Sequence, residues 1–277
     1  MPGIDAHQHF WKYDPVRDSW ITEDMSAIRK DFLPDDLEKV LKQHNFSGSV
    51  VVQSDQSEEE NSFQLENAKE NDFIKGIVGW VDLQADNVEE RLAYYSSFKK
   101  MKGFRHVLQG EAQRDLMLTS KFMNGISKLE KFGFTYDILI FPDQLQYMPQ
   151  FVTAFPNQKF VINHIAKPCI KAKEINEWKK GIEAVAEYEN VYCKISGMVT
   201  EADWHNWNPE DFTPYLDAVV YAFDIKRIMY GSDWPVCLVA GGYNKMLGIA
   251  KNYFVSYSKT EQDLFFGENA TQFYNLT

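Results

Sequence analysis

Cysteine is scarce in this 277-residue chain, which contains only Cys169, Cys193 and Cys237. The odd number and wide spacing of these residues fit neither a disulfide framework nor a CxxC zinc module. Free cysteine is among the most buried residue types, and thiols stay reduced in the cytoplasm. We therefore expect three buried, reduced thiols in a cytoplasmic protein.

Basic residues are also few, because the chain has 29 Lys and Arg residues against 40 Asp and Glu residues, which gives a formal net charge of −11. Nucleic-acid binding needs a surplus of Lys and Arg on one face, so this balance argues against such a partner. No apolar run approaches the roughly 18 residues of a membrane span. The first residues lack the basic and apolar regions of a secretory signal. We expect a cytoplasmic protein that binds neither nucleic acid nor membrane.

No Ser/Gly-rich or Pro-rich linker and no fixed-period repeat divides the chain, which predicts one domain over residues 1–277. Short apolar runs typical of buried strands alternate with helix-compatible segments. The predicted strands are 4–10, 49–54, 74–83, 103–109, 134–141, 160–165, 191–196 and 227–231. The predicted helices are 34–43, 87–98, 120–132, 142–155, 175–188 and 212–223.

Eight such alternations predict an α/β fold of the (β/α)₈ TIM-barrel type. A doubly wound open sheet is the alternative, because the pattern alone does not show closure. The chain has no GxGxxG after its first predicted strand and no GxxxxGK[ST], so nucleotide binding of the open-sheet type loses support.

Polar residues gather where three of these strands end, which in a barrel is the active-site end. His7 and His9 lie two residues apart on the first strand and point the same way. His164 ends the sixth strand, and Asp233 follows the eighth. Four converging groups of this kind could bind a divalent metal. Without metal, the imidazoles could donate hydrogen bonds to a carbonyl oxygen while Asp233 accepts a proton from water.

Five stretches carry a resemblance to a known family. They are residues 4–11 (IDAHQHFW), 103–109 (GFRHVLQ), 161–168 (VINHIAKP), 194–204 (KISGMVTEADW) and 230–235 (YGSDWP). Together they resemble the sugar-lactonase branch of the amidohydrolase superfamily, which includes L-fuconolactonases, L-rhamnonolactonases and the related 2-pyrone-4,6-dicarboxylate lactonases. The resemblance implies a (β/α)₈ barrel that opens a sugar lactone with water to give the sugar acid.

The chain departs from the binuclear members of that superfamily, which usually carry a bridging Lys or Glu on the fourth strand and a His on the fifth. Here the fourth predicted strand offers Arg105 and His106, and the fifth offers Tyr136 and Asp137 without a His. We therefore do not expect a two-metal site. The resemblance implies either that no cofactor is required or that a single Zn²⁺ is held by the metal ligands His7, His9, His164 and Asp233.

The predicted roles follow from the needs of lactone hydrolysis. Asp233 is the expected general base, and the three histidines are expected to polarise the carbonyl. Arg105 is expected to assist there, with a structural ion pair as its alternative role. Candidate substrate-binding residues are Trp11, His106, Lys194, Trp204 and Gln53, where Lys194 could instead be structural and the two tryptophans could be core residues. The acidic run at residues 58–60 predicts a solvated helix start.

Two alternative functions stay open. A metal-dependent decarboxylase would use the same scaffold with Arg105 and Lys194 binding the carboxylate. A non-catalytic sugar-binding barrel would keep the aromatic loop at residues 201–211 but would not need Asp233 set against three histidines. The expected partner is a small sugar lactone, and the expected assembly is a monomer or homodimer.

Overall fold

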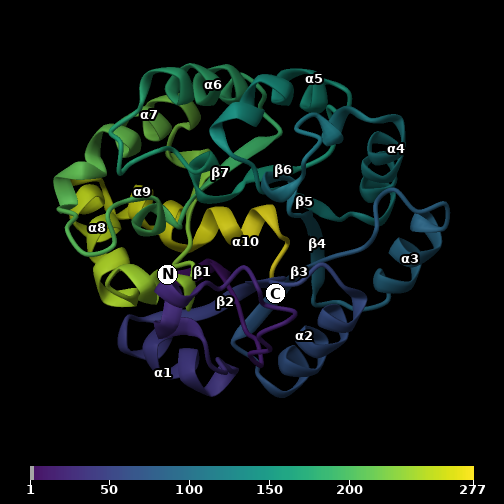
Figure 1. The fold of residues 1–277 in the computed structure, drawn as a ribbon, viewed down its shortest axis with the longest axis horizontal. Coiled ribbons are helices and arrows are strands. Elements are labelled where there is room, and N and C mark those ends of the chain that lie inside the picture. The colour runs from purple at the N-terminus through teal and green to yellow at the C-terminus, as the bar shows by residue number, and fades with distance from the viewer. Residues whose placement is uncertain (1–2) are drawn as a thin grey trace.

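A computed structural model describes residues 3–277 and shows eight parallel strands arranged in chain order around a barrel (Figure 1). Each strand pairs with the next, and the ring is closed by the segment after β8, where the His9 amide donates to the Trp234 carbonyl at 2.7 Å. The strands are β1 (Gly3–Gln8), β2 (Phe46–Val52), β3 (Ile74–Gly79), β4 (Met101–His106), β5 (Thr135–Ile138), β6 (Phe160–Ile162), β7 (Val191–Ile195) and β8 (Ile228–Tyr230). The prediction of a (β/α)₈ barrel is confirmed.

Helices between the strands form the outer ring in Figure 1. They are α1 (Pro34–Gln43), α2 (Glu58–Glu70), α3 (Val88–Tyr95), α4 (Ser120–Leu129), α5 (Met148–Thr153), α6 (Asn176–Ala186), α7 (Thr213–Phe223) and α8 (Tyr243–Tyr253), followed by α9 (Lys259–Asp263) and α10 (Asn269–Phe273). Helix α1 has the predicted bounds, because Pro34 fits the first helical position and Leu37 and Leu41 are buried one turn apart. Helices α8 to α10 were not predicted.

At the acidic start of α2, the prediction that residues 58–60 are all solvated is wrong. Glu60 is buried rather than solvated, and its carboxylate accepts hydrogen bonds from the backbone amides of Ser54 at 2.7 Å and Asp55 at 3.2 Å. Burial raises the pKa of Glu60. This carboxylate therefore fixes the loop that follows β2, instead of only favouring the start of its own helix.

The C-terminal helix α10 crosses the middle of the ring (Figure 1) and packs into the barrel interior. Phe273 and Tyr274 cluster with interior side chains of β1, β2, β3, β6 and β8, and the Tyr274 hydroxyl donates to Asp137 at 2.8 Å. Lys102, near the start of β4, donates from its Nζ atom to the Asn275 carbonyl at 2.8 Å. Because this contact lies at the start of a strand, α10 covers the end of the barrel opposite to the expected active site.

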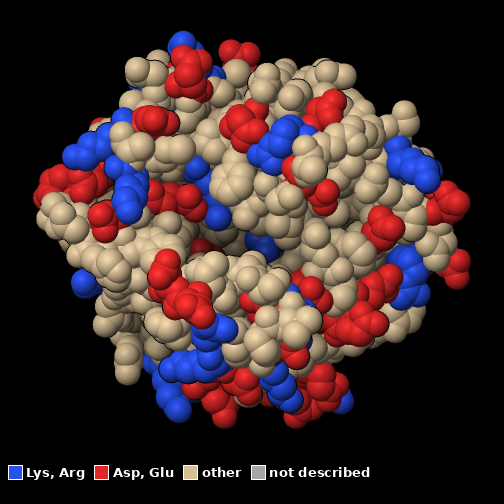
Figure 2. Space-filling model, in the orientation of Figure 1, with Lys and Arg blue, Asp and Glu red and all other residues tan. Residues whose placement is uncertain are grey.

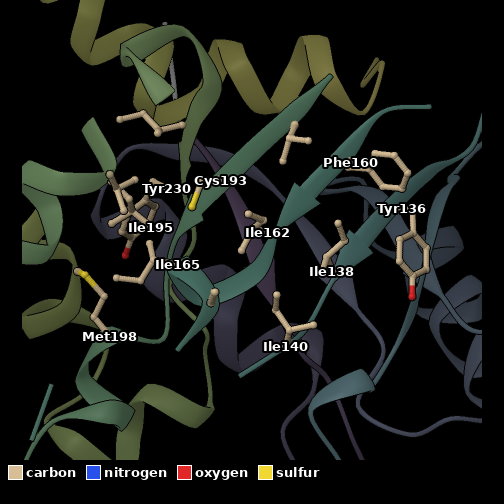
Figure 3. Packing of buried hydrophobic residues seen from close by; sticks show 14 of the residues in the cluster. Tyr136, Ile138, Ile140, Phe160, Ile162, Ile165, Cys193, Ile195, Met198 and Tyr230 are labelled. Atoms are coloured by element: carbon tan, nitrogen blue, oxygen red, sulfur yellow. The ribbon is translucent and has the colours of Figure 1, made fainter. Parts of the chain in front are cut away.

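The other core lies between the strands and the helices. Figure 3 shows alternate residues of neighbouring strands packed side by side, among them Ile138 of β5, Ile162 of β6 and Ile195 of β7. Cys193 and Cys237 are buried, but Cys169 is exposed, which corrects the expectation that all three thiols are buried. Across residues 3–277, no helix combines the length and apolar character needed to cross a membrane.

Candidate active site

The end of β1 is irregular where it presents the two histidines. Asp5 pairs with Ser49 and Gln8 with Val51, so three steps along β1 match two steps along β2. Such a bulge re-aims side chains and is common beside active sites. It turns His7 and His9 toward the barrel axis, with ring centroids 5.0 Å apart.

His164 reaches the same place from a left-handed turn. The residues after β6 have positive φ angles from His164 (53°) through Ile165, Ala166 and Lys167. This conformation is costly for L-residues, above all for a β-branched one such as Ile165, and such strain is concentrated at functional sites. The prediction that a strand continues over residues 163–165 is therefore wrong, because the chain turns there to aim His164 inward.

The loop after β7 fixes the His164 ring. Ser196 Oγ lies 2.9 Å from His164 Nδ1. Gly197 has φ 61°, and a Cβ atom at this position would lie 2.5 Å from the same nitrogen. Only glycine fits this close approach.

Asp233 completes the group from the segment after β8. Its backbone amide donates to the His7 carbonyl at 2.9 Å. Its Oδ1 atom lies 3.3 Å from His9 Nε2, 3.8 Å from His164 Nε2 and 3.9 Å from His7 Nε2. The structure thus brings together all four predicted residues, each at most 4% exposed.

Burial sets the protonation of these groups. It lowers the pKa of His164 to about 3, lowers the pKa of His9, and together with the Lys194 ammonium holds the pKa of His7 well below its usual value. Burial alone would raise the pKa of Asp233, but the facing His164 imidazole and the Lys167 ammonium favour the carboxylate, so that pKa lies below the usual value. At neutral pH the site therefore offers an ionised carboxylate among neutral imidazoles.

A cavity of about 450 Å³ opens above these residues, and Figure 2 shows the hollow in the middle of the molecule with basic side chains inside it. His9, His164, Asp233 and Arg105 contribute to its lining. The Arg105 guanidinium also donates to the Gln53 carbonyl and, at 3.2 Å, to Asn163 Oδ1. Arg105 therefore forms no ion pair with any described carboxylate and is held by neutral acceptors beside the cavity.

Only one of the predicted substrate-binding residues lines this cavity. Trp204 does so, from the loop after β7. Trp11 is buried, donates from Nε1 to the Lys30 carbonyl at 2.9 Å and lines a neighbouring pocket. His106 bonds to Glu111 at 2.7 Å, and Gln53 donates to the Arg105 carbonyl at 3.2 Å.

Lys194, the fifth predicted residue, is fully buried below the cavity and forms a 2.6 Å ion pair with Asp137. Other cavity residues were missed because they come from segments without a periodic pattern: Arg17, Trp20, Met25 and Lys167. Lys167 and Glu201 form a 3.1 Å ion pair at the wall. Lys167 lay inside a stretch that carried the family resemblance, which is the one signal that could have identified it.

The chemistry of the donor set fits one divalent metal. One nitrogen each of His7 and His164 and a carboxylate oxygen of Asp233 lie within 4.8 Å of one another. His7 Nε2 is buried and has no hydrogen-bond partner among residues 3–277. His9, also predicted as a ligand, is not part of this group of three, although its Nε2 atom is near Asp233. Two imidazoles and a carboxylate are ligands that zinc accepts.

Sequence and structure comparisons both relate this chain to amidohydrolases, including sugar lactonases. An L-fucono-1,5-lactonase of Burkholderia multivorans is 34% identical over 284 aligned residues, which cover 99% of this chain and 96% of that protein. An L-rhamnono-gamma-lactonase of Scheffersomyces stipitis is 24% identical over 65% of this chain and 61% of its own length. A crystal structure of a Burkholderia multivorans amidohydrolase with bound zinc superposes with a TM-score of 0.95 at 33% identity, covering 100% of both chains. The amidohydrolase family profile matches residues 4–276, and the chain therefore belongs to the amidohydrolase family.

Proposed function

We propose that this protein is a hydrolase that opens a sugar lactone to the sugar acid. The observation that carries the proposal is the convergence of three imidazole Nε2 atoms, within 3.9 Å, on one carboxylate oxygen at the cavity floor. Such an arrangement provides a base for water next to donors for a developing oxyanion. The similarity to lactonases over nearly the whole chain supports the same reaction class.

Asp233 accepts a proton from the attacking water as the water oxygen bonds to the lactone carbonyl carbon. The carbonyl oxygen gains negative charge, which N–H groups of His7 and His164 and the guanidinium of Arg105 stabilise. When the ring C–O bond breaks, the leaving oxygen takes the proton from Asp233. The product is the open-chain hydroxy acid, and Asp233 is again ionised.

His7, His164 and Asp233 would hold a divalent metal, which would supply Lewis-acid polarisation of the carbonyl. The protein residues perform the proton transfers described above in either case. Binding and orientation of the substrate fall to the cavity walls.

The cavity walls suit an aldonolactone such as L-fuconolactone or L-rhamnonolactone. Trp20 and Trp204 offer apolar faces for the sugar ring carbons, while Asp55, Arg17 and Glu201 offer acceptors and donors for hydroxyl groups. A volume of about 450 Å³ is within the range of small-molecule sites.

The test is a pH-indicator assay on purified protein with a panel of six-carbon aldonolactones in weak buffer, with spontaneous hydrolysis subtracted. Acid release above background from L-fucono- or L-rhamnonolactone supports the proposal, and Asp233→Asn is the matched inactive control. Release of CO₂ from an aromatic carboxylic acid would favour the decarboxylase instead. Saturable sugar binding without any turnover would favour the non-catalytic barrel.

A further inference from the structure

The Nδ1 atom of His7 faces an amine inside the barrel. Lys194 Nζ lies 3.3 Å from it, and both side chains are fully buried. A lysine ammonium has three donors and no acceptor. His7 Nδ1 can therefore meet this group favourably only as an acceptor, with its lone pair toward Lys194.

Lys194 is held in this position and in its charged form by Asp137, whose Oδ2 atom accepts from Nζ at 2.6 Å. The carboxylate is anchored in turn by Asn163 Nδ2 at 2.9 Å and by the Tyr274 hydroxyl, which reaches it from the C-terminal segment at 2.8 Å. A buried ammonium needs such a partner, because an unpaired buried charge is strongly unfavourable. The C-terminal segment thus helps to fix a charge directly beneath the candidate active site.

A second positive charge beside this ammonium would be unfavourable, so the His7 ring is neutral and carries a single proton. With Nδ1 accepting, that proton is on Nε2. This atom points to the centre, 3.9 Å from Asp233 Oδ1, and has no partner among residues 3–277.

We propose that Lys194, paired with Asp137, is a positioning residue that fixes His7 in the Nε2–H tautomer, so that His7 presents a hydrogen-bond donor to the centre of the site. This role rests on the proposed function in one respect only, namely that the donor serves the lactone carbonyl oxygen. It differs from the expectation that Lys194 binds substrate directly.

His9 has the opposite arrangement. Its Nδ1 atom lies 2.7 Å from the Val52 carbonyl, which can only accept, so Nδ1 carries the proton and Nε2 has the lone pair. His7 and His9 therefore differ in what they offer to the centre. A metal bound through His7 Nε2 would require the proton to move to Nδ1, against Lys194. Lys194 therefore weakens metal binding at His7.

The first test needs no variant. Long-range ¹H–¹⁵N correlation spectra of ¹⁵N-histidine-labelled, metal-free protein report which ring nitrogen of each histidine carries the proton, with His7→Asn used to assign the signals. We expect His7 to be protonated on Nε2 and His9 on Nδ1. A His7 ring protonated on Nδ1 would overturn the inference, whether or not the protein hydrolyses any lactone.

The second test uses Lys194→Gln, in which the amide nitrogen can still donate to Asp137 while the amide oxygen can accept from His7 Nδ1. The His7 proton should move to Nδ1, zinc affinity of the metal-free protein should rise about tenfold or more, and kcat should fall roughly 10²-fold with little change in KM. Tyr274→Phe is the matched control, because it removes another partner of Asp137 without contact to His7. It should keep the tautomer and the zinc affinity.

If Lys194→Gln folds but leaves the tautomer and zinc affinity unchanged, Lys194 is only a structural ion-pair partner and the inference is wrong. If this variant does not fold, the His7 tautomer in the spectrum of the unmodified protein decides whether the inference holds. If the unmodified protein shows the expected His7 tautomer but hydrolyses no lactone of the panel, the proposed function is refuted. The positioning role of Lys194 is then still supported.

Discussion

His9 Nε2 faces Asp233 Oδ1 across 3.3 Å, while His9 Nδ1 lies 2.7 Å from the Val52 carbonyl. Since the carbonyl accepts the Nδ1 proton, the neutral ring turns a lone pair toward a carboxylate, and two acceptors face each other. Such a contact is favourable only when a proton or a cation lies between them. The pair is therefore built to receive a proton, which is what a base that activates water must do.

Replacement of Asp233 by Asn should abolish this capacity while preserving the fold, because the amide can donate to the His9 lone pair. We expect kcat on the responsive lactone to fall about 10³-fold, within the range of general-base effects. Initial rates and thermal unfolding should be measured on the same preparation. A variant with near-normal kcat would remove Asp233 from the role of base.

Gly197→Ala should displace the His164 ring. A Cβ atom at residue 197 would lie 2.5 Å from His164 Nδ1, at a φ of 61° that already disfavours L-residues. We expect a loss of about 10²-fold in kcat through the misplaced donor. Gly133→Ala is the matched control, because Gly133 has φ 71° but no atom within 4 Å of the added Cβ. If both variants lose activity equally, backbone strain rather than displacement of His164 is responsible.

The sequence was a good guide to the barrel and a poorer guide to where its strands end. Continuous apolar runs such as residues 160–162 predict strands because both faces of a barrel strand are buried. The predicted strand extends to residue 165, however, because no local sequence pattern indicates the four residues with positive φ angles that start at His164. The C-terminal segment was missed since its burial depends on the barrel interior, which no local window contains.

Four residues of the candidate site could be predicted because the C-terminal ends of barrel strands converge, so that imidazole and carboxylate groups placed there meet at one site. Glu60 shows the opposite situation. Its acidic neighbours predict exposure, yet the folded chain buries it against the amides of Ser54 and Asp55. Similarly, the role of Lys194 depends on Asp137 and Tyr274, which are distant in sequence and meet only inside the closed barrel.

Removal of metal should leave activity largely intact, because Lys194 disfavours the His7 tautomer that a metal needs. Protein treated with EDTA and then desalted should be analysed for metal content and for rate in the same sample. We expect the rate to stay within about twofold of the untreated protein. Parallel loss of metal and rate, with recovery of both on adding Zn²⁺, would show that the metal is required.

Asp5 should make the protein more stable at mildly acidic pH. Its carboxyl group is buried and accepts a hydrogen bond from the Ser232 amide at 2.9 Å, and burial raises its pKa from 3.8 to about 6. Because the folded-state pKa is above the unfolded one, the stabilisation is complete below pH 3.8 and is lost as pH rises through about 6. The shift corresponds to about 3 kcal/mol at 1.36 kcal/mol per unit. Because part of the stabilisation is already lost at pH 5, urea unfolding at pH 5 and pH 8 should show about half of this difference, and Asp5→Asn should reduce it.

Trp204, which lines the cavity, and Trp11, which is buried outside it, should respond differently to substitution. Trp204 lines the cavity, so Trp204→Leu should raise KM roughly fivefold or more with a smaller change in kcat. Trp11 is buried against Phe32 and bonds to the Lys30 carbonyl, so Trp11→Phe should lower the free energy of unfolding by about 1–3 kcal/mol and leave KM unchanged. Steady-state kinetics and urea unfolding of both variants separate the two roles. A large KM effect at Trp11 with unchanged stability would place that residue, rather than Trp204, against the sugar.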